Sequence, residues 1–232
     1  MKTPAHNLPI KTKAFLLGAA AVGTLLSHAT AATETITLTM PPGFCLRANQ
    51  LNHAGGNGLN NVLPNVPLES QVLKFANNNY TADIFDGTMW VDNATGNPST
   101  TSVSPGQGFF FFNPTSQELQ ATLTGDVPQG DVSICFGPGF NLVGSPVPRP
   151  VSLTRSNGFP QVMEMQILRF DCATQRYKAI IIGQCPVLEG GFCWLQGDTG
   201  EPADSTIPVG EGFFVFNPGF TPLCWTSNFS VE

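Results

Sequence analysis

The sequence predicts an all-β fold made of two tandem, diverged copies of one sandwich-like or half-barrel module, closely packed. Three observations predict it: an internal repeat, short runs in which apolar and polar residues alternate, and an abundance of turn-forming residues. The 232 residues include 24 glycines and 20 prolines, while only 11% are charged. This composition is typical of short strands joined by many turns, and a hydrophobic fraction of 41% can supply a core.

The repeat consists of five blocks that recur in the same order. PPGFCLRAN at 41–49 matches GPGFNLVGS at an offset of 96, and VSPGQGFFFFNP at 103–114 matches IPVGEGFFVFNP at an offset of 104. Between them, LESQVLKF matches MEMQILRF, YTA matches YKA, and WVDNATGNP matches WLQGDTGEP. We therefore place a first module at 32–130 and a second module at 131–232. The growing offset places an insertion around IIGQCPVLEGG in the second module, and this insertion carries Cys185.

The first element along the chain is a predicted signal peptide at residues 1–31. A lysine-bearing start is followed by a 13-residue apolar run at 14–26 and by Ala-Thr-Ala at 29–31. This pattern indicates export through a Sec-type pathway. The apolar run is too short to span a bilayer, and no later run is long enough, so no membrane span is expected.

Short strands are predicted next. TITLTM at 35–40 alternates apolar residues with threonines, ANNN separates the β-rich runs QVLKF and YTADIF, and a turn separates GFFFFNP from QELQATLTG. No sustained helical pattern occurs, and residues 67–75 allow one short helical turn at most. A short linker at 125–132 favours close packing of the modules. The run GFFFFNP carries phenylalanines on both faces of its strand, which predicts either a strand covered on both sides or an exposed aromatic row.

Charge disfavours a nucleic-acid partner. After residue 31 the chain has sixteen acidic and seven basic residues, a net charge of −9. Phosphate contacts need clustered basic residues. We expect self-association, or a cell-surface or polysaccharide partner, instead.

The six cysteines favour disulfides over metal ligation, because the count is even, no C-x-x-C pair exists, and His53 is the only histidine after residue 31. Six cysteines allow 15 connectivities. We predict a Cys185–Cys193 bond that closes the insertion, with Cys172 as the rival partner of Cys185. The candidates are Cys45, Cys135, Cys172, Cys185, Cys193 and Cys224.

Catalysis is disfavoured, because a nucleophilic triad needs a base and His53 lies in the Gly/Asn-rich loop LNHAGGNG. Glu69 and Glu164 are the acids that match between the modules, and they are the candidates for a glycoside hydrolase-like enzyme. A lysine or arginine follows each of them five residues later, which favours a structural hydrogen bond or ion pair.

A sugar-binding site is the alternative that uses aromatic residues. Trp90 and Trp194 open matching turns, and a tryptophan beside Asp92, Asn93 or Asp198 can stack on a sugar ring. A duplicated core role explains the two tryptophans better. Four other acids lie beside Gly, Asn or Pro and are therefore predicted to form turns, namely Asp92, Asp126, Asp198 and Glu201. A calcium site at Asp198, Glu201 and Asp204 fits no EF-hand spacing, so we expect no metal and no cofactor.

The order GF-x-L, [KR]-F, W and PG-x-GFF-x-x-NP resembles poorly characterised repeat modules in secreted proteins of environmental Gram-negative bacteria. The resemblance covers nearly the whole chain after residue 31 and implies an extracellular β module without an assigned site. Together these patterns predict an extracellular, non-catalytic β protein that acts through its surfaces as a structural, adhesive or matrix component. The alternatives are a carbohydrate-binding module that uses Trp90 and Trp194, and the hydrolase.

Overall fold

Strands dominate the chain and confirm the predicted fold class. The computed structural model describes residues 32–185 and 191–230, so the predicted signal peptide lies outside the described residues. The first module contains β1 (Thr33–Met40), β2 (Gly43–Ala48), α1 (Leu59–Val62), β3 (Gln71–Ala76), β4 (Asn79–Phe85), β5 (Trp90–Asp92), β6 (Gly108–Asn113) and β7 (Leu119–Asp126). The second contains β8 (Gly130–Phe136), β9 (Gly139–Gly144), β10 (Val151–Ser152), the 3₁₀ turn η1 (Arg155–Asn157), β11 (Gln166–Asp171), β12 (Arg176–Gln184), β13 (Phe192–Gln196), β14 (Thr206–Ile207), β15 (Gly212–Asn217) and β16 (Leu223–Phe229).

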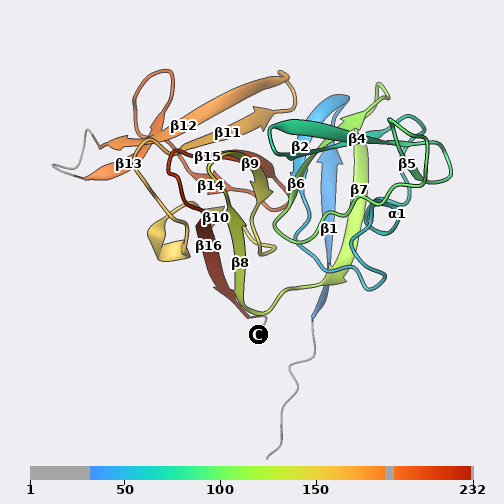
Figure 1. Cartoon of the computed structure of the whole chain (residues 1–232), viewed down its shortest axis with the longest axis horizontal. Helices are drawn as coiled ribbons and strands as arrows, with labels where there is room; N and C mark the ends of the chain where they lie inside the picture. The colour runs from blue at the N-terminus through green and yellow to red at the C-terminus, as the bar shows by residue number, and fades with distance from the viewer. Residues whose placement is uncertain (1–31, 186–190, 231–232) are drawn as a thin grey trace, which may run out of the picture. The chain divides into compact units, whose positions relative to one another are not determined.

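The two modules share the arrangement of their main strands, and the second has an additional two-stranded ladder, β10-β14. Each has a five-stranded antiparallel sheet, with the order β2-β6-β3-β4-β5 in the first module and β9-β15-β11-β12-β13 in the second. Each also has a two-stranded ribbon, β1-β7 or β8-β16 (Figure 1). Strands at the same position in the two orders come from matching blocks of the repeat, which supports a duplication.

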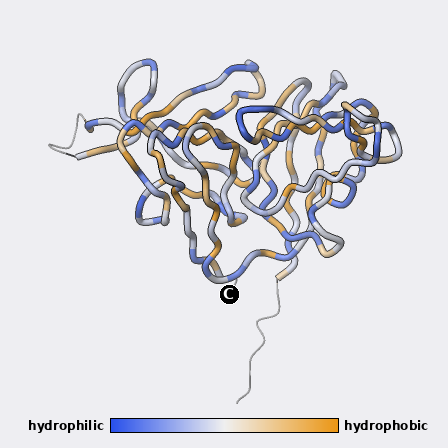
Figure 2. The backbone as a smooth tube through the Cα atoms, in the orientation of Figure 1, coloured by the Kyte–Doolittle hydropathy of each residue, from blue (hydrophilic) through white to orange (hydrophobic). Residues whose placement is uncertain are grey.

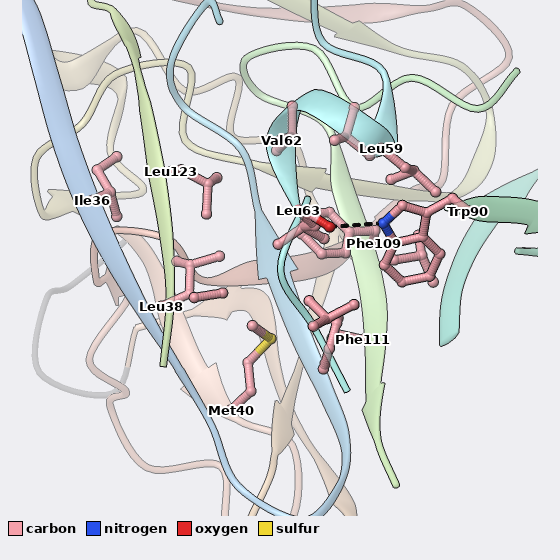
Figure 3. Close-up of a cluster of buried hydrophobic side chains, with 14 of the residues drawn as sticks. Ile36, Leu38, Met40, Leu59, Val62, Leu63, Trp90, Phe109, Phe111 and Leu123 are labelled. Carbon is pink, nitrogen blue, oxygen red and sulfur yellow. Dashed lines mark hydrogen bonds between the residues drawn. The ribbon is translucent and has the colours of Figure 1, made fainter. Parts of the chain in front are cut away.

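Each module has its own hydrophobic core between the ribbon and one face of the sheet. In the first module, alternation along β1 turns Ile36, Leu38 and Met40 toward Phe109 and Phe111 of β6 (Figure 3). The corresponding core of the second module includes Phe213 and Val215 of β15 and Trp225 of β16, which belong to a separate cluster. Hydrophobic residues follow the strands and hydrophilic residues gather in the hairpin turns and loops (Figure 2).

The other face of each sheet forms the junction between the modules. Phe110 of β6 and Phe214 of β15 belong to a third buried cluster with Leu46 and Leu142. Their rings lie 6.2 Å apart between centroids. The strand GFFFFNP is therefore covered on both sides, one face by its own core and the other by the second module. Of the two alternatives for this strand, the covered strand is therefore the correct one, and the second module supplies the second cover.

Reciprocal hydrogen bonds join matching positions of the two modules across the junction. Ala48 N–H donates to Gly210 C=O at 3.0 Å, and the equivalent Gly144 N–H donates to Gly106 C=O at 2.9 Å. Glycines allow this approach: a Cβ on Gly212 would lie 2.4 Å from the main-chain oxygen of Arg47. The two modules are closely packed, as predicted.

This contact makes Gly212 a test of the junction. Because the obstructing atom is main chain, Gly212→Ala forces the modules apart and is expected to lower the free energy of unfolding by about 1–3 kcal/mol. Gly137→Ala is the control, since nothing lies within 4 Å of a Cβ there and its φ is not positive. Urea denaturation measures both. Equal stability of the two variants would contradict this account of the junction.

One local prediction needs correction, and one short helix was missed. The residues 125–132 are not mainly linker, because β7 continues to Asp126 and β8 begins at Gly130. The short helix lies at Leu59–Val62, whereas a turn precedes β3 in the window 67–75. In the helix, Leu59 and Val62 are buried in the core of the first module, so packing against that core stabilises the helix at this position.

All six cysteines form disulfides, and the predicted Cys185–Cys193 bond is confirmed. A second bond joins Cys135 of β8 to Cys224 of β16, which face each other across the ribbon. The third joins Cys45 of β2 to Cys172 in the turn between β11 and β12, so it connects the modules covalently. Three disulfides fit a protein of an oxidising compartment.

Candidate functional site

The two tryptophans are core residues, so the alternative in which they present a face to a sugar does not hold. Trp90 and Trp194 are both buried. Trp90 Nε1–H donates to Leu63 C=O at 2.8 Å (Figure 3), and Trp194 Nε1–H donates to Leu153 C=O at 2.7 Å. Burial of the ring with its N–H satisfied is the usual state of a core tryptophan. The duplicated core role is therefore correct.

The matched acids also have a local role, though not the predicted ion pair. Glu69 and Glu164 are exposed and have φ values of 68° and 64° in the turns before β3 and β11. Their N–H groups donate to Phe85 C=O and Ile182 C=O. The basic residues five positions later have other partners: Lys74 contacts Gln107, and Arg169 pairs with Glu211. Each pair is separated because the glutamate lies in the turn while the basic residue lies on the sheet.

Asp92 is a turn former, as expected. Its Oδ1 accepts hydrogen bonds from Thr95 Oγ1–H and from the N–H groups of Ala94 and Thr95. These hydrogen bonds lower the pKa of Asp92, and the bond from the Thr95 side chain has the largest effect. Asn93 is exposed beside it and donates its N–H to Ala82 C=O. The predicted binding residues thus lie in different modules rather than in one site.

The described surface has a groove on the second module with a volume of about 870 Å³. It is lined by the β11–β12 hairpin, by the end of β13 and the loop after it, and by the turn before β15. The volume is within the range of ligand sites. Its lining residues are Arg169, Phe170, Asp171, Tyr177, Lys178, Ala179, Ile180, Gln196, Gly197, Asp198, Ala203, Asp204 and Glu211. Of the predicted binding residues, Asp198 alone lies here.

A bidentate ion pair fixes one side of the groove. Arg169 Nε–H and Nη2–H donate to the two oxygens of Glu211 at 2.6 and 2.9 Å. The pairing raises the pKa of Arg169. Two parallel charge-assisted bonds of this kind hold both side chains in one geometry.

A second ion pair lies along the hairpin. Lys178 Nζ donates to Asp171 Oδ2 at 2.8 Å, and this hydrogen bond, with those from the N–H groups of Thr174 and Ala173, lowers the pKa of Asp171 to about 2. In the loop after β13, Asp204 Oδ1 accepts a hydrogen bond from Thr206 N–H. The groove carboxylates at 171 and 204 are therefore ionised at neutral pH, since the interaction with Thr206 also lowers the pKa of Asp204.

Polar groups with unused hydrogen-bonding capacity lie beside these pairs. The side chains of Gln196 and Asp198 are exposed and make no hydrogen bond or ion pair with any residue in 32–185 or 191–230. Ile180 and Ala203 add apolar surface. The groove thus combines free acceptors and donors, a fixed ionic framework and apolar patches, which is the composition of a binding surface for polar ligands.

The first module has different residues at the equivalent positions. Lys74 replaces Arg169 and Gln107 replaces Glu211, and Lys74 Nζ donates to Gln107 Oε1 at 3.0 Å. Without a carboxylate partner, burial lowers the pKa of Lys74 to about 8. This site therefore lacks the charge-balanced pair of the groove.

We expect Gln107→Glu to supply that pair. The new carboxylate raises the pKa of Lys74 and increases the free energy of unfolding at pH 7 by up to about 1 kcal/mol. The folded-state pKa of Lys74 is below its unfolded value, so in the wild type this group adds stability as pH rises from about 8 toward 10.5. The gain from Gln107→Glu should therefore shrink at pH 10, where wild-type Lys74 is neutral.

Urea denaturation at pH 7 and pH 10 measures this difference. Gln120→Glu, on the exposed face of β7, is the matched control for added charge. If Gln107→Glu raised the free energy of unfolding equally at pH 7 and pH 10, the proposed pairing of the new carboxylate with Lys74 would be contradicted.

The remaining sequence candidates form no further centre. Among residues 32–185 and 191–230, no three His, Cys, Asp or Glu side chains lie close enough together to hold a metal ion. Asp198, Glu201 and Asp204 therefore do not form the calcium site considered from the sequence. His53 accepts from Gly55 N–H in its own loop. Within the same ranges, no helix has the length and apolarity needed to cross a membrane.

Sequence reasoning missed most of the groove. Arg169 and Glu211 are 42 residues apart and meet through the pairing of β11 with β15. The available signal was the repeat itself, because Lys74 and Gln107 occupy the matching positions of the first module. Comparison with known proteins adds no assignment: no family model, no curated protein and no solved structure matches the chain.

Proposed function

We propose that this is an extracellular, non-catalytic binding protein that acts as an adhesive or matrix component, and that the groove holds a hydroxyl-rich, uncharged polymer such as a neutral polysaccharide. The observation that carries the proposal is the pair of unbonded polar side chains, Gln196 and Asp198, at the edge of an open groove. Carboxylate and amide oxygens accept hydrogen bonds from hydroxyls, and the amide N–H₂ donates to them.

Charge supports the choice of ligand class. Four acids and two basic residues line the groove, in a chain that has a net charge of −9 after residue 31. A polyanion such as nucleic acid or a sulfated glycan meets repulsion there. A neutral polymer avoids this cost, and the two ion pairs preorganise the surface that it meets.

A binding role also accounts for the acids better than hydrolysis does. The groove carboxylates Asp171 and Glu211 are held in ion pairs by Lys178 and Arg169, which leaves them poorly placed to donate a proton to a substrate. Glu69 and Glu164 lie in exposed turns and do not line the groove. We therefore expect no turnover of polysaccharides or esters. Turnover that disappears in Glu69→Gln or Glu164→Gln would instead support the hydrolase.

A glycan array with the mature protein, followed by calorimetry on the best neutral glycan, tests the proposal. The double variant Gln196→Ala/Asp198→Ala is expected to weaken binding by about tenfold or more, the value of one or two polar hydrogen bonds. Asn93→Ala, in the matching turn of the first module, should leave binding unchanged. Preference for a cationic peptide or a sulfated glycan, or equal binding by the double variant, would contradict the proposed ligand class.

A further inference from the structure

The two terminal strands that meet the junction, β2 and β9, have different edges. The edge of β2, in the first module, is covered by the turn between β11 and β12 of the second module. Gln175 Oε1 accepts from Phe44 N–H at 3.0 Å, and Gln175 Nε2 donates to Phe44 C=O at 2.8 Å. The carboxamide thus replaces a neighbouring strand, and the Cys45–Cys172 disulfide fixes it there.

At the matching edge, Phe140 of β9, no side chain of residues 32–185 or 191–230 forms the equivalent pair of hydrogen bonds. The β3–β4 turn of the first module is two residues shorter, and Asn77 and Asn141 stand where the other side of the junction has Cys172 and Cys45. The Asn141 amide donates instead to Gly137 C=O and Gly139 C=O. As a result, Phe140 is 39% exposed, whereas Phe44 is partly buried.

The backbone of Phe140 points outward from the sheet. Gly144, four residues later on the same strand, donates its N–H away from the sheet to Gly106, and alternate residues of a strand direct their polar groups to the same side. Within residues 32–185 and 191–230, the N–H and C=O of Phe140 have no hydrogen-bond partner. An unpaired donor and acceptor on one residue is the arrangement that β-pairing uses.

Aromatic residues lie beside this edge. The ring of Phe140 packs on Phe216 at 4.9 Å and on Phe214 at 6.3 Å between centroids, so the exposed patch continues the junction cluster. Phe220, in the turn after β15, is 98% exposed. Its turn begins beside the start of β9, because Asn217 at the end of β15 pairs with Gly139. The first module has Ser116 at this position, so the exposed phenylalanine belongs to the second module alone.

We propose that this edge binds the same edge of a second molecule, so that the protein forms a two-fold symmetric dimer through β9. About a two-fold axis, Phe140 of each molecule donates its N–H to, and accepts from, Phe140 of the other, which closes a hydrogen-bonded antiparallel pair. The turn of Phe220 and the rings of Phe140 and Phe216 flank this pair.

The choice of a second molecule rests on charge and on continuity with the junction. Residues 137–144 and 216–222 contain no charged side chain, although the chain is strongly acidic after residue 31. Two like-charged molecules approach each other most easily at such an edge, which also lacks the charges that normally protect strand edges. Gly144 and Val143 contact the first module and Leu142 is buried in the junction cluster, so backbone pairing is confined to the two Phe140 residues and the dimer depends on the aromatic contacts beside them.

Sedimentation velocity over a range of protein concentrations tests the dimer with the mature, oxidised protein. We expect a concentration-dependent dimer, and Phe220→Ser should raise its dissociation constant about tenfold or more by removing an exposed ring from the interface. Phe220 makes no core contact, so the variant keeps its fold. Phe192→Ser is the control, since this residue is 60% exposed on β13 at the opposite edge of the sheet.

Cross-linking tests the register. Cα atoms of a hydrogen-bonded antiparallel pair lie about 5.5 Å apart, within the range that a disulfide spans, so Phe140→Cys should give a covalent dimer on non-reducing gels. Leu68→Cys, which places a thiol at another exposed site, should not. A monomer at all concentrations, or a dimer that Phe220→Ser leaves unchanged and Phe140→Cys does not trap, would overturn the proposal. These measurements do not involve the groove ligand, so they stand or fail separately from the proposed function.

Discussion

Replacing both Cys45 and Cys172 with alanine is expected to lower the free energy of unfolding by about 5 kcal/mol, by the chain-entropy relation for a loop of 127 residues. The bond restricts the unfolded chain across both modules, and the other covalent link between the modules is the three-residue segment between β7 and β8. Loss of the disulfide also frees the turn at the end of the β11–β12 hairpin, which lines the groove.

Chemical denaturation under non-reducing conditions measures the effect. The double alanine variant of Cys185 and Cys193 is the matched control, because that bond spans 8 residues and should contribute about 2.5 kcal/mol. If the two variants lose the same stability, the inter-module bond does not act by restricting the unfolded chain.

Phe110→Ala is expected to cost about 3–5 kcal/mol, the usual value for an aromatic ring removed from a buried cluster. Phe110 lies at the centre of the junction. Its ring contacts those of Phe44, Tyr80, Phe170, Tyr177 and Phe214. The surrounding groups come from two sheets held by a disulfide, so they cannot close on the cavity completely.

Phe112→Ala provides the comparison on the same strand. Phe112 faces the same side as Phe110, is half-buried and has one ring contact, with Phe44 at 4.8 Å. We expect a loss of about 1 kcal/mol there. Thermal or urea unfolding that shows similar losses at the two positions would mean that the junction contributes little to stability.

The predicted site could be found only in part from the sequence. Asp198 was selected because it follows Trp194 in a polar turn, and it does line the groove. The reason was nevertheless wrong, since the tryptophan ring points into the core. A turn sequence shows that a polar residue is near the surface, but it does not show which way the preceding aromatic side chain points.

The disulfides also divide into one that the sequence could predict and one that it could not. The Cys185–Cys193 bond was predictable because a short insertion brings both cysteines close along the chain. The Cys45–Cys172 bond was not, because its residues are 127 positions apart and meet only where one module's hairpin turn reaches the other module's edge strand. No periodicity within a module carries that information.

By itself, the sequence determined the strands, their repeat and the duplicated tryptophans, because side-chain alternation and turn chemistry act over a few neighbouring residues. Only the tertiary structure decided which module covers the second face of GFFFFNP, that Arg169 meets Glu211, and that β9 keeps a free edge while Gln175 covers β2. These features depend on strand register and on the packing of one sheet against another. Both are set by the sum of many distant contacts, which a single local pattern does not contain.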